Sequence, residues 1–300
     1  MIIIEKYRVI EEEKNKIRLK DIANFHPKDI FECGQAFRWY KEDDESYTTV
    51  AYGRALNVKM EGSDAVLYPS TLEEFNDIWV HYFDLERDYS LIKEELRNDP
   101  ILEEAIDFGP GIRILNQEPF EMTISFIISA NNQIPRIRKS IETIALNYGR
   151  KIDNPLKNRE YYSFPSPDEL KDADLEEFNS LTKVGFRGQR VLATSRIIAD
   201  GDLKLDPIFK MTRDEGKIEL MTLPGVGPKV SDCILLFGFN KDEAFPVDVW
   251  VKRVMEHFYL KEDTNVKHIG QHGARIFGNL AGFAQQYLFY YARETGIGRK

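Results

Sequence analysis

A lysine and an aspartate stand close together in the chain, each at a point where a helix is expected to begin. Lys229 follows a Pro-Gly-Val-Gly-Pro turn at residues 224–228, and Asp248 follows Pro246 at the start of the next apolar run. A neutral amine is a nucleophile, and a carboxylate stabilises a developing positive charge. Taken singly, each residue has a simpler interpretation, Asp248 as a helix cap and Lys229 as a solvated amine.

The turn before Lys229 is suited to holding an anion. Gly225 and Gly227 permit positive φ values and bring bare backbone N–H groups to the surface. These groups lie at the start of the following helix, where the helix dipole favours negative charge, so a phosphate is the expected ligand. A plain helix–turn–helix hairpin packed in a core would show the same short motif, and the motif alone leaves both interpretations open.

Together, the lysine that begins a phosphate-binding helix and the nearby aspartate resemble the helix–hairpin–helix Gly/Pro–Asp signature. This signature is typical of the superfamily of base-excision DNA glycosylases. Further segments are similar to blocks of its 8-oxoguanine DNA glycosylase family, in matching order from about residue 7 to residue 292. These segments are residues 34–39, 129–137, 184–187 and 281–289.

The resemblance implies an α+β fold in two domains. We expect an N-terminal antiparallel, TATA-binding-protein-like β domain with trailing helices over residues 1–117. A helical HhH-GPD catalytic domain should follow over residues 118–300, with the lesion pocket between the two.

The resemblance also assigns catalytic roles. Asp248 would stabilise the positive charge that builds at C1′ as the N-glycosidic bond breaks. Lys229 would attack C1′ if burial and cationic neighbours hold its amine neutral. The resulting Schiff base permits β-elimination at the 3′ phosphate, so we expect a bifunctional glycosylase and abasic-site lyase.

The family's lesion-binding residues map onto four positions. The base must leave the stack to be recognised, and the Gly34 carbonyl would accept the N7–H that 8-oxoguanine has and guanine lacks. Gln285 resembles the residue that binds the Watson–Crick edge. Phe289, one helical turn later, resembles the stacking ring, and Cys233 would line the other side of the pocket. Without the resemblance, Cys233 and Phe289 would be interpreted as core residues.

A second set resembles residues that contact the opposite base and the DNA backbone. Arginine suits the former task because its planar fork can bind a base edge bidentately; phosphate contact is the alternative. Phe186 stands where the family often has tyrosine, and Trp250 where eukaryotic members have histidine, which puts one phosphate contact in doubt. The residues in this set are Asn131, Arg136, Phe186, Arg187, Gly225, Gly227 and Trp250.

Sheet elements are expected in the front of the chain. Polar and apolar residues alternate over residues 56–60, and Gly62 begins a turn before a return strand at residues 65–68. A charged loop joins residues 37–40 to residues 47–50. Antiparallel hairpins up to about Ser70 are the simplest interpretation.

Helix signals dominate the rest. Capping boxes are expected at residues 70–73, 166–169 and 212–215. Residues 120–130 are apolar on nearly all sides and predict a central buried helix. A stripe from Ile137 to Tyr148 predicts a helix that ends at Gly149, and residues 273–292 predict a single last helix.

Charge and composition permit a DNA-binding role. The net charge is −9, but residues 1–110 carry 14 basic and 25 acidic residues, whereas residues 111–300 carry 27 and 25. Residues 111–300 could therefore present a local basic face to a polyanion. Cys33 and Cys233 are too few for a disulfide framework or a four-ligand metal site.

We therefore expect a reduced, cytoplasmic monomer, nucleoid-associated if prokaryotic, without a membrane segment. Its partner would be double-stranded DNA containing 8-oxoguanine. No cofactor or metal is expected, although a structural cation on the hairpin carbonyls is compatible with the sequence.

Two other functions stay open. A monofunctional relative, or one acting on alkylated bases, would share the superfamily; Lys229 counts against the first and the four lesion-pocket blocks against the second. A DNA-binding module without activity would use the hairpin alone, and the pairing of Lys229 with Asp248 counts against it.

Overall fold

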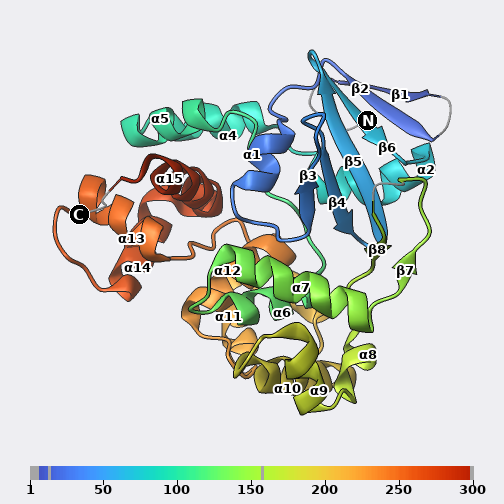
Figure 1. Ribbon diagram of the computed structural model, residues 1–300. Helices are drawn as coiled ribbons and strands as arrows, with labels where there is room; N and C mark the ends of the chain where they lie inside the picture. Colours follow the sequence, from blue (N-terminus) through green and yellow to red (C-terminus); the bar gives the residue numbers. More distant parts are fainter. Residues whose placement is uncertain (1–6, 13–14, 157–158, 298–300) are drawn as a thin grey trace.

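The computed structural model describes residues 7–12, 15–156 and 159–297. The N-terminal part of the chain contains a sheet, and the C-terminal part is mainly helical, as Figure 1 shows. The sheet has the strand order β1-β2-β6-β5-β4-β3, and every neighbouring pair is antiparallel. This architecture confirms the α+β prediction. The strands are β1 (Arg8–Glu12), β2 (Lys16–Lys20), β3 (Trp39–Lys41), β4 (Tyr47–Ala51), β5 (Arg54–Glu61) and β6 (Asp64–Tyr68).

Both hairpins expected from the alternating pattern are present. β5 pairs with β6 and β3 with β4, and Leu56 and Val58 point into the core with no exposed surface. The prediction of hairpins alone was wrong between β2 and β3, where the chain forms helix α1 (Pro27–Glu32). A helix of six residues is too short to display a helical period in its sequence.

The core of the sheet fixes the orientation of α1. Phe31 of α1 stacks on Tyr47 of β4 with ring centroids 5.8 Å apart, and Trp79, Tyr82 and Phe83 pack in the same cluster. The last three come from a helical run made of α2 (Leu72–Glu74), a π-helical turn (Phe75–Trp79) and α3 (Val80–Tyr82), followed by Phe83. Anchored in this way, α1 delivers the chain to Gly34.

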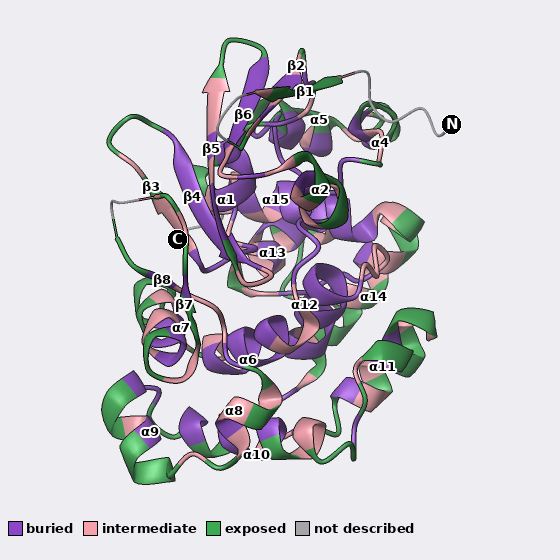
Figure 2. Cartoon of the chain, turned by 90° about the vertical axis from the view of Figure 1, so that its right-hand side faces the viewer, coloured by how far each residue is buried: buried purple, intermediate pink, exposed green. Residues whose placement is uncertain are grey.

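The rear of the chain packs around α6 (Pro119–Ser129), which is buried from Glu121 to Ile128, as predicted. α6 packs against α12, and both are largely purple in Figure 2, whereas α9 is mostly exposed and α11 is only partly buried. The other elements after the sheet are α4 (Tyr89–Leu96), α5 (Pro100–Phe108), α7 (Ile134–Tyr148), β7 (Lys151–Ile152), β8 (Tyr161–Tyr162), α8 (Pro167–Lys171), α9 (Leu175–Thr182), α10 (Arg187–Ala199), α11 (Arg213–Leu220), α12 (Pro228–Gly238), α13 (Val249–Val254), α14 (Val266–Phe277) and α15 (Ala281–Thr295).

Helix ends follow the predicted caps with one shift. The capping boxes that begin with Ser166 and Thr212 are confirmed, and α7 ends before Gly149. The first box starts one residue later than predicted: the Thr71 hydroxyl accepts from the Glu74 N–H, and the Glu74 carboxylate accepts from the Thr71 N–H. The buried Ser70 hydroxyl instead donates to a backbone carbonyl.

The single last helix was a wrong prediction. α14 ends at Phe277, Gly278 has φ +53°, and a short 3-10 turn leads into α15. This left-handed conformation favours glycine and interrupts the helix. The break gives α15 its own direction, which brings Gln285 and Phe289 to the turn after α1.

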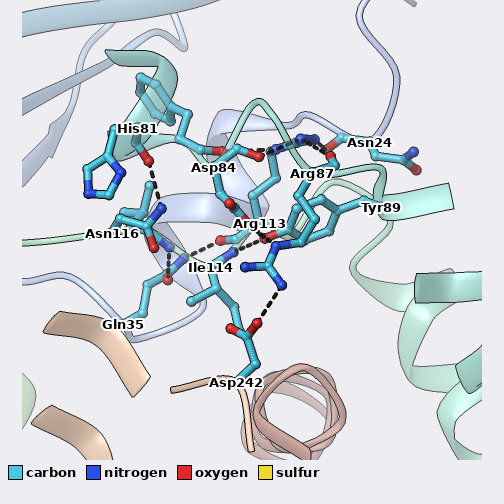
Figure 3. Close-up of polar contacts among 12 residues, drawn as sticks. Asn24, Gln35, His81, Asp84, Arg87, Tyr89, Arg113, Ile114, Asn116 and Asp242 are labelled. Atoms are coloured by element: carbon cyan, nitrogen blue, oxygen red, sulfur yellow. Dashed lines mark hydrogen bonds and ion pairs between the residues drawn. The ribbon is translucent and has the colours of Figure 1, made fainter. Parts of the chain in front are cut away.

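A polar network joins the two halves of the chain. Arg87 forms ion pairs with Asp84 and with Asp242, which lies in the segment leading to Asp248 (Figure 3). Arg113 donates to the carbonyls of Phe83 and Asp84, each at 3.0 Å. α4 and α5 contribute side chains to the helical core, so the halves share packing, and the division at residues 117 and 118 stays a prediction.

Candidate active site

A cavity of about 610 Å³ lies where the turn after α1 meets the helical half. Its walls come from the end of α6, the first turns of α12 and α13, and one face of α15. Residues from distant parts of the sequence therefore meet at one site. They are Gly34, Phe37, Phe126, Ser129, Ala130, Asn131, Asn132, Ile134, Ile137, Lys229, Val230, Cys233, Phe237, Pro246, Asp248, Val249, Trp250, Gln285, Gln286, Phe289 and Arg293.

Lys229 enters the cavity from the first turn of α12, after Gly227 and Pro228 have started the helix. Its Nζ lies 5.5 Å from the centroid of the Phe126 ring. Burial acts to lower the pKa of Lys229, but Cys233 and the Asp248 carboxylate outweigh burial, so the pKa lies above its ordinary value. This direction favours the protonated amine in the free protein, because the charged group beside Lys229 is the Asp248 anion rather than a cation.

Asp248 is the N-cap of α13, as predicted. Its Oδ1 accepts hydrogen bonds from the N–H groups of Trp250 at 2.9 Å and Val251 at 2.8 Å. Burial raises the pKa of Asp248, and the Val251 N–H and the charge of Lys229 partly oppose that increase. These bonds hold the carboxylate in the cavity wall beside the amine.

The four residues predicted to bind the lesion all line the cavity. Burial raises the pKa of Cys233 to about 11, so it faces the cavity as a neutral thiol. Gln285 is 5% exposed, and its Oε1 has no hydrogen-bond partner among the described residues. An unsatisfied buried amide oxygen is costly, so this atom is ready to accept a hydrogen bond from a ligand.

The predicted opposite-base residues are divided between the cavity and its rim. Asn131 lines the cavity, whereas Arg136 and Phe186 are exposed outside it. Arg187 stacks under the Phe186 ring and donates to the carbonyls of Ala130 and Asn131 at 2.7–3.0 Å. In this structure its guanidinium therefore holds the loop after α6, and it does not reach the cavity.

The hairpin has one positive φ where two were expected. Gly225 has φ +87°, and a side chain there would collide with Arg190. Gly227 has φ −97°, which any residue can adopt, and an added Cβ would meet no atom within 4 Å. The missing side chain at residue 227 leaves open surface at the start of α12, where an anion can approach the backbone.

Trp250 lines the cavity in the first turn of α13, and Arg253 stacks over its ring at 4.8 Å. Among the described residues, no group of three or more acidic, histidine or cysteine side chains could hold a metal ion. None of their helices is long and apolar enough to cross a membrane.

The sequence did not single out two polar residues of the cavity, Gln286 and Arg293. Gln286 Nε2 donates to the Cys33 carbonyl at 2.8 Å, and Arg293 donates to the Glu32 carbonyl. Arg293 follows the predicted Phe289 by one helical turn and Gln286 by about two, and this helical spacing is a signal that could have found them.

Comparison with known proteins places this site in a class. Residues 17–123 match the model of the 8-oxoguanine DNA glycosylase N-terminal domain, and residues 124–277 match the HhH-GPD superfamily of base excision DNA repair proteins. A probable N-glycosylase/DNA lyase of Methanothermobacter thermautotrophicus is 36% identical over 234 residues, 72% of each chain. The N-glycosylase/DNA lyase OGG1 of Arabidopsis thaliana is 29% identical, over 86% of this chain and 75% of that protein.

Solved structures agree over nearly the whole chain. The 8-oxoguanine glycosylase/lyase of Clostridium acetobutylicum, in complex with DNA containing cytosine opposite 8-oxoguanine, is 44% identical with a TM-score of 0.93. That similarity covers 98% of this chain and 99% of the other. The chain is thus a base excision DNA repair protein of the helix–hairpin–helix superfamily, and within it the chain belongs to the 8-oxoguanine DNA glycosylase/lyase family.

Proposed function

We propose that this protein excises 8-oxoguanine from duplex DNA and then cleaves the abasic site through a Schiff base on Lys229. One observation carries the proposal: Lys229 and Asp248 begin two successive helices and line the same cavity as Gly34, Gln285 and Phe289. The volume of about 610 Å³ leaves room for an extruded nucleotide.

The first step replaces one bond at C1′ with another. The glycosidic bond breaks, the base leaves with the bonding electrons and takes up a proton, and the Lys229 nitrogen forms a new bond to C1′. Positive charge develops on the sugar as the base departs, and the Asp248 carboxylate stabilises it. The raised pKa of Lys229 favours its protonated form in the free protein, so the amine must lose a proton before it attacks.

The second step cleaves the strand. The attached nitrogen loses a proton, and its electron pair forms the C1′–nitrogen double bond of the Schiff base as the C1′–O4′ bond breaks. The O4′ oxygen leaves with that bond's electron pair and takes up a proton, which opens the sugar ring. Removal of a C2′ proton then breaks the bond between C3′ and the phosphate oxygen, and the phosphate leaves with the electron pair. Both steps use side chains alone, and we propose no cofactor; a structural cation on the hairpin carbonyls remains compatible with this scheme.

The partner is duplex DNA. The exposed start of α12 and Arg136 lie on the residue 111–300 portion, which carries no acidic excess. We propose that a monomer acts on the DNA, because one chain supplies every residue of the site. The working location would be the cytoplasm, at the nucleoid in a prokaryote. Light scattering at working concentration should give the mass of one chain.

A nicking assay on a duplex with a single 8-oxoguanine separates the proposal from its alternatives. We expect strand cleavage at the lesion without added alkali. Excision that needs alkali for cleavage would indicate a monofunctional glycosylase. Activity only on alkylated bases would indicate a different selectivity, and binding without excision would indicate a DNA-binding module.

A further inference from the structure

The end of α1 and the turn that follows it present a run of backbone carbonyls, and most of them are bonded. Gln35 Nε2 donates to the Ile30 carbonyl at 2.9 Å, and Trp39 Nε1 donates to the Ala36 carbonyl at 3.1 Å. Gln117 Nε2 donates to the Gln35 carbonyl at 3.0 Å. Carbonyls at a helix end commonly find such partners, so an unbonded one in this run needs an explanation.

α15 supplies the donors for the two carbonyls directly before Gly34. Gln286, which is 1% exposed, donates to the Cys33 carbonyl at 2.8 Å. Arg293 donates to the Glu32 carbonyl, and its guanidinium carbon lies 5.2 Å from the centroid of the Phe289 ring. The two donors are two helical turns apart on α15, so they lie on one helix face and form hydrogen bonds with successive peptides.

Gln35 holds the turn from the other side. It has no exposed surface; its Nε2 also donates to the Arg113 carbonyl at 2.7 Å, and its Oε1 accepts from the Leu115 N–H at 2.8 Å. The peptides before and after Gly34 are therefore fixed by buried side chains.

Gly34 differs from the residues on either side of it. No hydrogen bond to its carbonyl is found among the described residues, although the residue lines the cavity. Its φ of +89° requires glycine, and an added Cβ would lie 2.7 Å from Arg293 Nη1 and 2.8 Å from Phe289 Cε1. Gly34, Phe289 and Arg293 are thus in direct contact.

We propose that Gln286 and Arg293 are positioning residues for lesion recognition: by holding the Cys33 and Glu32 carbonyls, they fix the turn so that the unbonded Gly34 carbonyl faces the cavity. There it accepts the N7–H of an oxidised purine, whereas the N7 lone pair of guanine is repelled by the same oxygen. The proposal rests on the proposed function and adds the residues that set its selectivity. Gln286 acts only through the backbone; Arg293 also supports the Phe289 ring.

The test measures affinity for three duplexes that the enzyme cannot cleave. They carry 2′-fluoro-8-oxoguanine, 2′-fluoroguanine or a tetrahydrofuran abasic analogue opposite cytosine. Gln286→Met should weaken binding of the 8-oxoguanine duplex by roughly 3- to 10-fold, the value of one hydrogen bond, and leave the abasic duplex unchanged. Arg293→Met should do the same, and Arg293→Lys, which keeps a donor, should restore most of the loss.

Tyr291→Phe is the matched control, because it removes an α15 hydrogen bond to Glu104 and leaves the turn after α1 untouched. Its affinities should equal those of the wild type. Equal weakening of binding to the 8-oxoguanine and abasic duplexes by both Met variants would overturn the positioning role. Met variants whose ratio of affinities for the 8-oxoguanine and guanine duplexes equals that of the wild type would also overturn it. If Gln286→Met does not fold, the Arg293 pair decides, since that side chain is 15% exposed. A wild type that binds the 8-oxoguanine and guanine duplexes equally would instead refute the proposed function itself.

Discussion

One wall of the cavity and the rim beside it differ in how far they are organised before DNA arrives. The lesion wall, made of Gly34, Gln285, Gln286, Phe289 and Arg293, comes from α15 and the turn after α1. Its backbone is held by buried donors, and Gln285 already presents an unbonded oxygen. The rim, made of Asn131, Arg136, Phe186 and Arg187, is mostly exposed, with Phe186 at 64%.

The contrast separates recognition that is built into the fold from recognition that DNA must complete. Arg187 uses its Nε and Nη2 on the carbonyls of Ala130 and Asn131, so a base contact through these two atoms would require it to release that loop. Phe186 is already exposed, so we expect it to enter a gap in the duplex without rearrangement. Lesion selectivity should therefore depend on rigid geometry, and opposite-base selectivity on rearrangement at the rim.

The largest effect should come from Asp248→Asn, which tests the chemistry that depends on both the lesion wall and the rim. Asparagine is a good N-cap, so the melting temperature should change little. The rate of excision should fall by about 100-fold or more, because the neutral amide cannot balance the sugar cation. Single-turnover excision and thermal unfolding measure the two properties separately. An excision rate equal to that of the wild type would leave Asp248 with a capping role only.

Gly34→Ala should distort the geometry of the lesion wall. The new methyl group would lie less than 3 Å from Arg293 and Phe289, at a positive φ that costs about 1–2 kcal/mol for other residues. We expect at least a tenfold weaker binding of lesion DNA, on the scale of a mispositioned contact. Gly53→Ala is the control, because its φ is also positive, +67°, but no atom lies within 4 Å of the added methyl. Equal losses of lesion binding in both variants would show that backbone strain alone is responsible.

The pH dependence follows from the charges beside the lesion wall. The raised pKa of Lys229 means that its neutral fraction grows about tenfold per pH unit below that pKa. The raised pKa of Asp248 means that its carboxylate is lost at a higher pH than usual when the solution is acidified. Both shifts place the optimum on the alkaline side, so Schiff-base formation should accelerate from pH 6 to pH 9. A rate that declines over this range would contradict the assignment.

The smallest effect should appear at the rim. Arg136→Ala should reduce a preference for cytosine opposite the lesion by about tenfold, from the loss of one base contact. Gln285→Ala should slow excision whatever base lies opposite, because it acts on the lesion wall. Single-turnover rates opposite C, A, G and T for both variants test the contrast. One common factor for all four pairs in Arg136→Ala would make it a phosphate or structural residue.

The sequence predicted the parts of this molecule that depend on local signals. Alternation predicted β5, the turn at Gly62 predicted the return strand β6, and the Ser166 and Thr212 caps predicted helix starts. The residues predicted to bind the lesion meet in one cavity. The roles of Gln286 and Arg293 could not be predicted, since their bonds to Cys33 and Glu32 span 253 and 261 residues. The raised pKa of Lys229 depends likewise on which charges the fold brings beside it.

The central claim, a lysine Schiff base formed on lesion DNA, is tested most directly by reduction with borohydride. Wild-type protein mixed with a duplex carrying 8-oxoguanine should give a covalent protein–DNA complex, resolved as a slower band on a denaturing gel. Lys229→Gln should give none while still binding the duplex. A complex of undiminished yield in the Lys229→Gln variant would contradict the account, since another amine would then be the nucleophile.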